Sequence, residues 1–182
     1  MIQKRNFILN NGVSKPKIGL GALFAKNNQL EQAVHYALEL GYRKLDTASA
    51  YGNEITIGKA IRKSTLNRED IFLTTKVWNT EQGYDNTLIA FDKSLVNLQT
   101  DYVDMYLIHW PVKSKYKATY KAMEKIYSSG RAKAIGVCNF NRDQIKDLLD
   151  ATSVVPALNQ IEIHPRLSQS AMVDFANEHS IQ

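Results

Sequence analysis

The sequence predicts an α/β fold: part of a (β/α)8 TIM barrel that ends after its sixth βα unit, with a β-hairpin ahead of the first strand. Short apolar runs alternate with amphipathic helical stretches along all 182 residues. Strand starts recur about every 30 residues, the length of a βαβ unit. Because strictly alternating units form a parallel sheet covered by helices, we interpret residues 1–182 as one domain.

A hairpin is expected first. Asn11-Gly12 lies between the apolar segment Phe7-Ile8-Leu9 and Val13. An Asn-Gly pair in this setting is typical of a type I′ turn, in which both central residues have positive φ.

Six short apolar runs are then predicted to be strands. In chain order they cover residues 17–22, 44–48, 71–77, 103–109, 133–138 and 157–163.

Six helices are predicted from apolar residues that recur three and four positions apart. In the first, Leu30, Ala33, Val34, Ala37 and Leu38 fall on one face. The predicted helices cover residues 29–40, 54–62, 85–98, 118–128, 142–149 and 168–179.

Residues that start and stop helices agree with these bounds. Gly41 and Gly130 follow two of the helices and suit the left-handed position just past a helix end. Asn141 and Ser168 precede the last two and are expected to be N-caps.

Two architectures fit six βα units, an open sheet and a barrel. An open dinucleotide-binding sheet would carry GxGxxG after its first strand, but 19–24 reads GLGALF and lacks the third glycine. Polar residues also follow or end successive strands: Asp46, Lys76, His109, Asn139 and Gln160. In a barrel such residues converge on one mouth, which favours the barrel.

Composition excludes several classes of function. Apolar residues make up 44% and the net charge is +5, with basic residues scattered along the chain. This charge could favour a phosphorylated cofactor, but no basic cluster indicates a nucleic-acid partner. No run approaches the roughly 20 apolar residues of a membrane span, so no membrane partner is expected. The polar N-terminus and the single cysteine, Cys138, favour a cytoplasmic protein.

The strand-end residues indicate proton-transfer chemistry. A lysine in an interior strand is costly unless a carboxylate pairs with it, and Asp46 lies at the height of Lys76 on the neighbouring strand. Tyr51 follows in a loop, where a cation would favour the phenolate and so suit proton transfer. His109 could donate a hydrogen bond to a carbonyl oxygen. Taken alone, Asp46 would be interpreted as a helix cap and His109 as a core residue. Together with Lys76 and Tyr51 they indicate a catalytic site.

Other catalytic and metal-binding patterns are missing from the sequence. It contains no GxSxG of a hydrolase, no HExxH and no phosphate-binding GxxxxGK[ST]. Its four histidines are far apart in sequence, so no metal site is expected.

Five segments, in order, resemble the aldo-keto reductase family. GYRKLDTA at 41–48, with YGNE at 51–54 and Ile57-Gly58, is similar to the first family signature. KVWN at 76–79 resembles the segment that carries the family lysine. Residues 101–111, which end in LIHWP, resemble the strand that carries the family histidine. Gly130-Arg131 with IGVCNF at 135–140, and NQIEIHP at 159–165, resemble the fifth and sixth strands.

The resemblance implies NADPH-dependent, reversible reduction of aldehydes and ketones, with NADH as a possible substitute. Tyr51 would be the general acid, Lys76 and Asp46 would assist it, and His109 would orient the carbonyl of a small-molecule substrate. The implied cofactor-binding residues are Gly21, Ala22, Asp46, Cys138, Asn139 and Gln160. The implied substrate pocket contains Leu23, Trp78 and Trp110, although both tryptophans could equally be packing residues. Family members commonly have serine at the position of Cys138.

The length departs from the family pattern. A complete barrel has eight βα units and roughly 250 residues. The resemblance implies that the seventh and eighth strands, the region that grips the cofactor phosphates and a loop that shapes substrate choice all lie outside this sequence. The alternative interpretation is therefore a truncated, catalytically inactive remnant or an interaction module of the same fold.

We predict that the isolated 182-residue chain self-associates or is unstable, because unpaired barrel edges invite pairing with another chain. Sedimentation velocity and thermal melting test this prediction. A monomer that melts in one cooperative transition would contradict it.

Overall fold

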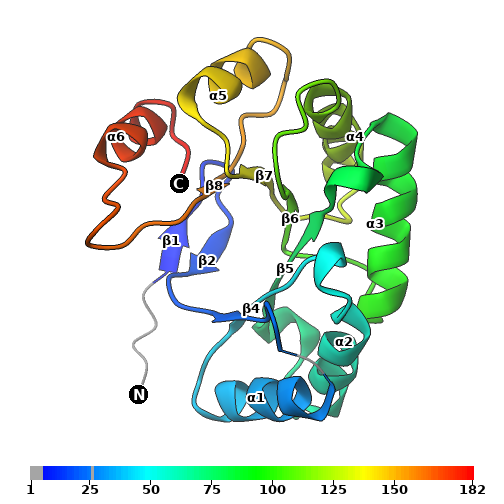
Figure 1. Cartoon of the computed structure of the whole chain (residues 1–182). Coiled ribbons are helices and arrows are strands. Elements are labelled where there is room, and N and C mark those ends of the chain that lie inside the picture. The colour runs from blue at the N-terminus through cyan, green and yellow to red at the C-terminus, as the bar shows by residue number, and fades with distance from the viewer. Residues whose placement is uncertain (1–5, 26) are drawn as a thin grey trace.

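The computed structural model describes residues 6–25 and 27–182. Six parallel strands form one sheet in the order β3-β4-β5-β6-β7-β8, so each strand pairs with the next in sequence. The sheet curves round the middle of the molecule and helices α1–α6 lie outside it (Figure 1). The predicted succession of six βα units is confirmed.

The observed strands are shorter than the predicted ones. They are β3 (Leu20–Gly21), β4 (Lys44–Asp46), β5 (Phe72–Val77), β6 (Met105–Ile108), β7 (Ile135–Cys138) and β8 (Asn159–Gln160). Several predicted runs extend past the last ladder pair because burial continues there: Thr47 and Ala48 are both fully buried beyond β4. Apolar residues in the sequence indicate which side chains are buried, whereas a strand ends where its backbone no longer pairs with the neighbouring strand.

The helices match the prediction more closely. They are α1 (Asn27–Glu39), α2 (Glu54–Lys63), α3 (Tyr84–Leu98), α4 (Tyr116–Ser128), α5 (Arg142–Leu149) and α6 (Ser170–Glu178). Three 3-10 turns were not predicted: η1 (Ser49–Tyr51), η2 (Arg68–Asp70) and η3 (Asn79–Glu81). Within the described residues, none of the helices has the length and apolar character needed to span a membrane.

Three of the four predicted helix boundaries are confirmed. Gly41 and Gly130 have φ of 95° and 77°, and the Asn141 side chain accepts a hydrogen bond from the Gln144 N–H at 2.9 Å. Ser168 is not an N-cap, and the residue in that position is Gln169. The tight turn that pairs His164 with Leu167 leaves Ser168 in the connecting loop.

The N-terminal hairpin pairs β1 (Asn6–Ile8) with β2 (Ser14–Pro16). The predicted type I′ turn is wrong, because Gly12 has a positive φ of 83° and Asn11 does not. The Asn11 side chain instead donates to the Lys133 carbonyl oxygen at 2.9 Å, which ties the turn to the loop before β7. The hairpin thus covers the end of the sheet at which the strands begin.

Side-chain alternation divides the core into two layers. Tyr106 and Ile108 of β6 belong to the outer cluster between sheet and helices. Met105 and Leu107 belong to the inner cluster, which also contains Leu9 of the hairpin. Burying each such side chain contributes about 1.5–3 kcal/mol. The inner face is therefore apolar near the hairpin, while its polar residues gather at the opposite end of the strands.

We predict that Gly58→Ala destabilises the fold. A Cβ at this α2 position would lie 2.4 Å from the Leu98 carbonyl oxygen at the end of α3, so the two helices would have to separate. Overpacking of this kind costs about 1–3 kcal/mol of unfolding free energy, which urea denaturation measures. Gly21→Ala is the control, since its added Cβ meets nothing within 4 Å. Equal stability of both variants would contradict the prediction.

Candidate active site

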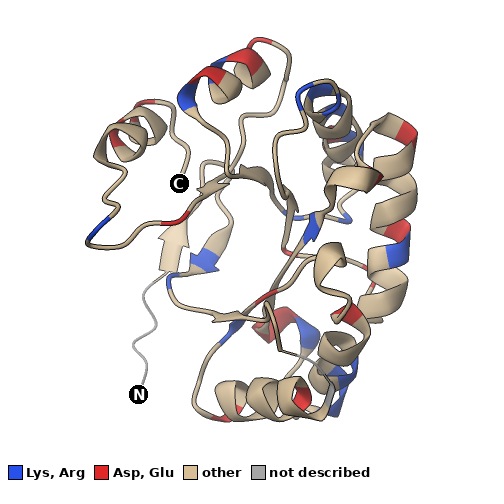
Figure 2. Ribbon diagram, viewed as in Figure 1, with Lys and Arg blue, Asp and Glu red and all other residues tan. Residues whose placement is uncertain are grey.

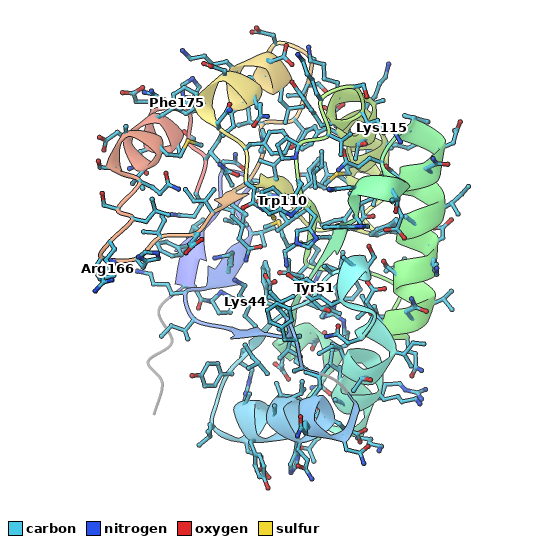
Figure 3. The ribbon with its side chains drawn as sticks, viewed as in Figure 1. Lys44, Tyr51, Trp110, Lys115, Arg166 and Phe175 are labelled. Atoms are coloured by element: carbon cyan, nitrogen blue, oxygen red, sulfur yellow. The ribbon has the colours of Figure 1, made fainter. Side chains whose placement is uncertain are left out.

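The structure brings together the four residues predicted to be catalytic. Asp46 ends β4, Lys76 lies near the end of β5, and His109 follows β6 directly. Tyr51 ends the 3-10 turn η1, which follows β4. Tyr51 lies in the middle of the ring of strands in Figure 3, with Trp110 on the same inner side. Their shared location results from the parallel sheet, in which all strands end on one side.

A buried ion pair forms the centre of this cluster. The Lys76 side chain is 3% exposed, and its Nζ donates to Asp46 Oδ1 and, at 2.9 Å, to the Thr47 carbonyl oxygen. Burial lowers the pKa of Lys76, but the charge of the Asp46 carboxylate, together with Cys138, the hydrogen bond to Asp46 and Tyr51, outweighs this effect, and the net pKa is raised. Lys76 is therefore charged and fixed in place at neutral pH.

Tyr51 is held against both the lysine and the histidine. The Lys76 Nζ lies 5.3 Å from the centroid of the Tyr51 ring. The Tyr51 and His109 rings meet edge to face, with centroids 5.5 Å apart. Gly52, with φ of 64°, lets the chain turn from η1 toward α2 immediately after the tyrosine. The phenol is thus positioned by local backbone geometry and by its two ring contacts.

His109 is neutral at physiological pH. Burial, and after it the charge of Lys76, lowers the pKa of His109 to about 4. Within the described part of the chain its Nδ1 is buried without a hydrogen-bond partner. The Trp78 ring packs against the imidazole with centroids 5.1 Å apart. A neutral imidazole has one N–H to donate, which suits a carbonyl oxygen as acceptor.

Three predicted cofactor-binding residues lie around the ion pair and His109. Gln160 Nε2 donates to Asp46 Oδ2 at 3.0 Å, and Cys138 Sγ contacts Gln160 Oε1 at 3.4 Å. Asn139 has φ of 62° and donates through Nδ2 to the His109 carbonyl oxygen at 2.9 Å. Burial raises the pKa of the Cys138 thiol to about 12, so it is not a thiolate.

The remaining predicted residues lie at the same end of the sheet. Gly21 is exposed at the end of β3, and Ala22 is buried, its carbonyl oxygen held by Asn53 Nδ2 at 2.8 Å. Leu23 and Trp110 are 50% and 46% exposed, so Trp110 is not a core packing residue. Trp110 and Asn139 also line a cavity of about 480 Å³ beside α6.

Sequence reasoning missed the groups that fix the loops around the mouth. Ser49, two residues before Tyr51, contacts Glu81 Oε2 at 2.6 Å through its hydroxyl. The same carboxylate accepts the Trp78 backbone N–H at 3.2 Å. Glu81 thereby links the turn that carries Tyr51 to the loop that carries Trp78. Neither Ser49 nor Glu81 has a distinctive sequence context, so only their proximity reveals the link.

The chain is similar to known proteins over almost its whole length. The model of the aldo/keto reductase family matches residues 17–182. The glyoxal reductase of Bacillus subtilis is 47% identical over 175 residues, which are 96% of this chain and 63% of that protein. The chain thus spans somewhat less than two thirds of this curated relative.

Solved structures show the same likeness. An aldo/keto reductase from Brucella melitensis superposes with a TM-score of 0.96 at 46% identity, over 98% of this chain and 71% of that one. A Bombyx mori aldo-keto reductase in complex with NADP superposes with a TM-score of 0.91 at 34% identity, over 100% of this chain and 65% of that one.

We predict that His109 makes the fold less stable in acid. The ordinary pKa of a histidine is 6.5, and the pKa of His109 in the folded chain is about 4. As pH falls from 6.5 toward 4, the unfolded chain takes up a proton that the folded chain does not, so stability is lost in this window. The loss is on the order of 2 kcal/mol, which is below the value that roughly 1.4 kcal/mol per pKa unit would give for a fully buried group, because solvent screens the partly exposed ring.

His109→Gln should flatten this part of the profile, measured by urea denaturation at several pH values. His35→Gln, on the exposed face of α1, is the control and should keep the slope. An unchanged slope in His109→Gln would show that other groups cause the acid sensitivity.

Proposed function

This chain belongs to the aldo/keto reductase family, and we propose that its protein reduces aldehydes and ketones to alcohols, reversibly, with NADPH as cofactor. The observation that carries the proposal is the convergence of Tyr51 and His109 on the buried Lys76–Asp46 pair. NADH is the second candidate cofactor. When bound, the dihydronicotinamide supplies the hydride.

Tyr51 is the proposed general acid. Reduction of a carbonyl places negative charge on its oxygen, and a proton must reach that oxygen as the charge develops. The Lys76 ammonium, 5.3 Å from the Tyr51 ring centroid, favours negative charge on the phenol oxygen once the proton has left. Asp46 and the Thr47 carbonyl keep that ammonium in place.

His109 is proposed to orient the substrate. Since its pKa is lowered to about 4, it is a neutral hydrogen-bond donor and does not compete with Tyr51 as the proton source. A donor aimed at the carbonyl oxygen stabilises the charge that develops there. Leu23, Trp78 and Trp110 offer apolar surface for the rest of a small-molecule carbonyl substrate.

The polar groups beside the ion pair suit a nicotinamide carboxamide, which both donates and accepts hydrogen bonds. Asn139 and Gln160 bring amide groups, and Cys138 brings a thiol that donates more weakly than a hydroxyl. We propose that these three residues, with Asp46, Gly21 and Ala22, adjoin the nicotinamide end of the cofactor. The four proposed catalytic residues are all present and lie together at one end of the sheet, which disfavours the alternative of an inactive remnant or interaction module.

We also propose a cytoplasmic location, where a reducing environment keeps the buried free thiol of Cys138 intact. Basic and acidic residues are dispersed over the outer helices in Figure 2, which gives no support to a nucleic-acid partner. The self-association predicted for the isolated chain would use the outer edge of β3 and the part of the β8 edge that Gln182 does not occupy.

Tyr51→Phe tests the proposed function. In the protein expressed from its natural gene, loss of the phenol hydroxyl should lower kcat by about 10²–10⁴-fold, while NADPH still binds. Turnover is followed by NADPH absorbance with a panel of small aldehydes and ketones, and binding by NADPH fluorescence. Tyr36→Phe, on the exposed face of α1, is the matched control and should leave both unchanged.

Each result has a clear meaning. Retained turnover in Tyr51→Phe would remove the tyrosine from its role while leaving the reductase function intact. An unaltered protein that binds NADPH but reduces no carbonyl, or that does not bind it, would overturn the proposed function itself.

A further inference from the structure

A buried carboxylate starts the helix that follows Tyr51. Glu54, the first residue of α2, is 4% exposed, so it is almost wholly removed from water. Its Oε1 accepts a hydrogen bond from the Thr75 hydroxyl at 2.7 Å, and its Oε2 accepts one from Asn97 Nδ2 at 3.1 Å. One side chain thereby joins the first turn of α2 to strand β5 and to the last turn of α3.

A carboxylate suits this position because both of its oxygens are used. An ionised carboxylate loses its hydration on burial, and hydrogen bonds from the protein replace part of it. Glu54 also lies at the start of a helix, where the N–H groups of the first turn favour negative charge. A glutamine has one oxygen and could take only one of these two hydrogen bonds as an acceptor. The contacts of Glu54 therefore account for the acidic residue at this buried place.

The hydrogen bond to Thr75 fixes the segment that carries Tyr51. Only two residues separate the tyrosine from Glu54, and Thr75 directly precedes Lys76 on β5. Because neighbouring residues of a strand face opposite sides, the Thr75 hydroxyl meets α2 while the Lys76 ammonium faces the inside of the sheet. The bond thus sets how far the start of α2, with the tyrosine just ahead of it, lies from the lysine.

A contact on the other side of the tyrosine leads to the same part of β5. The Ser49 hydroxyl, two residues before Tyr51, lies 3.1 Å from the Lys76 carbonyl oxygen. On the α2 side, Gly52 follows the tyrosine with φ of 64°. Since glycine restricts backbone rotation least, the backbone between the tyrosine and α2 does not fix the phenol by itself. The side-chain bond of Glu54 supplies the constraint that the glycine does not.

We propose that Glu54 is a positioning residue for the proton transfer from Tyr51. Through its hydrogen bond with Thr75 it holds the phenol at a fixed distance from the Lys76 ammonium. The inference rests on the proposed function and adds to it a residue that acts through the tyrosine. A displacement of a reacting group by about 1 Å lowers a rate by on the order of 10²-fold, so loss of the bond should act on kcat. Binding of cofactor and substrate involves other groups and should change little.

Three variants of the protein expressed from its natural gene test the proposal. Glu54→Ala removes both acceptors and should lower kcat by on the order of 10–100-fold. The KM for a small aldehyde and the Kd of NADPH, from fluorescence titration, should stay nearly constant. Thr75→Val removes only the donor hydroxyl and should lower kcat to a similar degree. Glu54→Gln keeps one acceptor and should recover most of the rate.

The double variant Glu54→Ala/Thr75→Val shows whether the two residues act through one bond. It should be no slower than Glu54→Ala, because both changes remove the same hydrogen bond. A further loss in the double variant, equal to the loss in Thr75→Val alone, would mean that the residues act separately and would overturn the proposal.

Glu124→Ala separates positioning from stability. Glu124 is also a carboxylate that accepts several hydrogen bonds, among them one from the Val154 N–H at 2.8 Å in the connection from α5 to β8. This variant should lower the melting temperature and leave kcat unchanged at temperatures well below it. If Glu54→Ala likewise has a lower melting temperature and a normal kcat, the Glu54 contacts are only structural and the proposal is overturned.

Thr75→Val decides the matter if Glu54→Ala does not fold, since it removes one hydroxyl and little volume. In its crystal structure the Lys76 Nζ should lie farther than 5.3 Å from the Tyr51 ring centroid. An unmoved tyrosine or a normal kcat would overturn the proposal. Turnover of the unaltered protein is measured first. If that protein reduces no carbonyl, the proposed function fails and this inference with it, whereas normal kcat values in the variants of an active protein overturn the inference alone.

Discussion

Burying the Lys76 ammonium group is costly unless a carboxylate lies beside it, and this requirement organises the end of the sheet that carries the candidate active site. Asp46 neutralises Lys76 from the neighbouring strand, and the Thr47 carbonyl oxygen adds a second acceptor. Breaking such a pair costs about 3–5 kcal/mol, so the pair favours the register of β4 and β5 in which Asp46 and Lys76 meet. The Tyr51 ring and the Gln160 amide both contact this pair, so one interaction supports the fold and the proposed chemistry alike.

The two ends of the sheet differ in polarity. At the hairpin end, Leu9 belongs to the inner apolar cluster and covers the inner face of the sheet where the strands begin. At the other end the strands give way to loops, and polar groups that would be costly in a closed core can face a ligand. The proposed chemistry uses this contrast, because a carbonyl oxygen that gains charge needs donors in a space with little water to compete.

Loop contacts give the site a rigidity that strand ends alone would not supply. Glu81 accepts hydrogen bonds from the Ser49 hydroxyl and the Trp78 N–H, so the turn before α2 is tied to the loop after β5. Asn53 holds the Ala22 carbonyl oxygen and accepts from the Thr47 hydroxyl at 2.6 Å. These side chains touch none of the reacting groups, yet they fix the backbone that positions Tyr51 and the end of β3.

The sequence by itself determined the order of strands and helices, the parallel sheet and the residues that end its strands. These features follow from the local periodicity of apolar residues, which is a property of the sequence and does not depend on contacts between distant residues. It did not determine the Asn11 turn, because a side-chain bond to the distant Lys133 carbonyl replaced the expected local geometry. It also did not determine the N-cap of α6 or the Glu81 link. Each of these depends on groups far apart in sequence, and only the folded chain sets the distances between them.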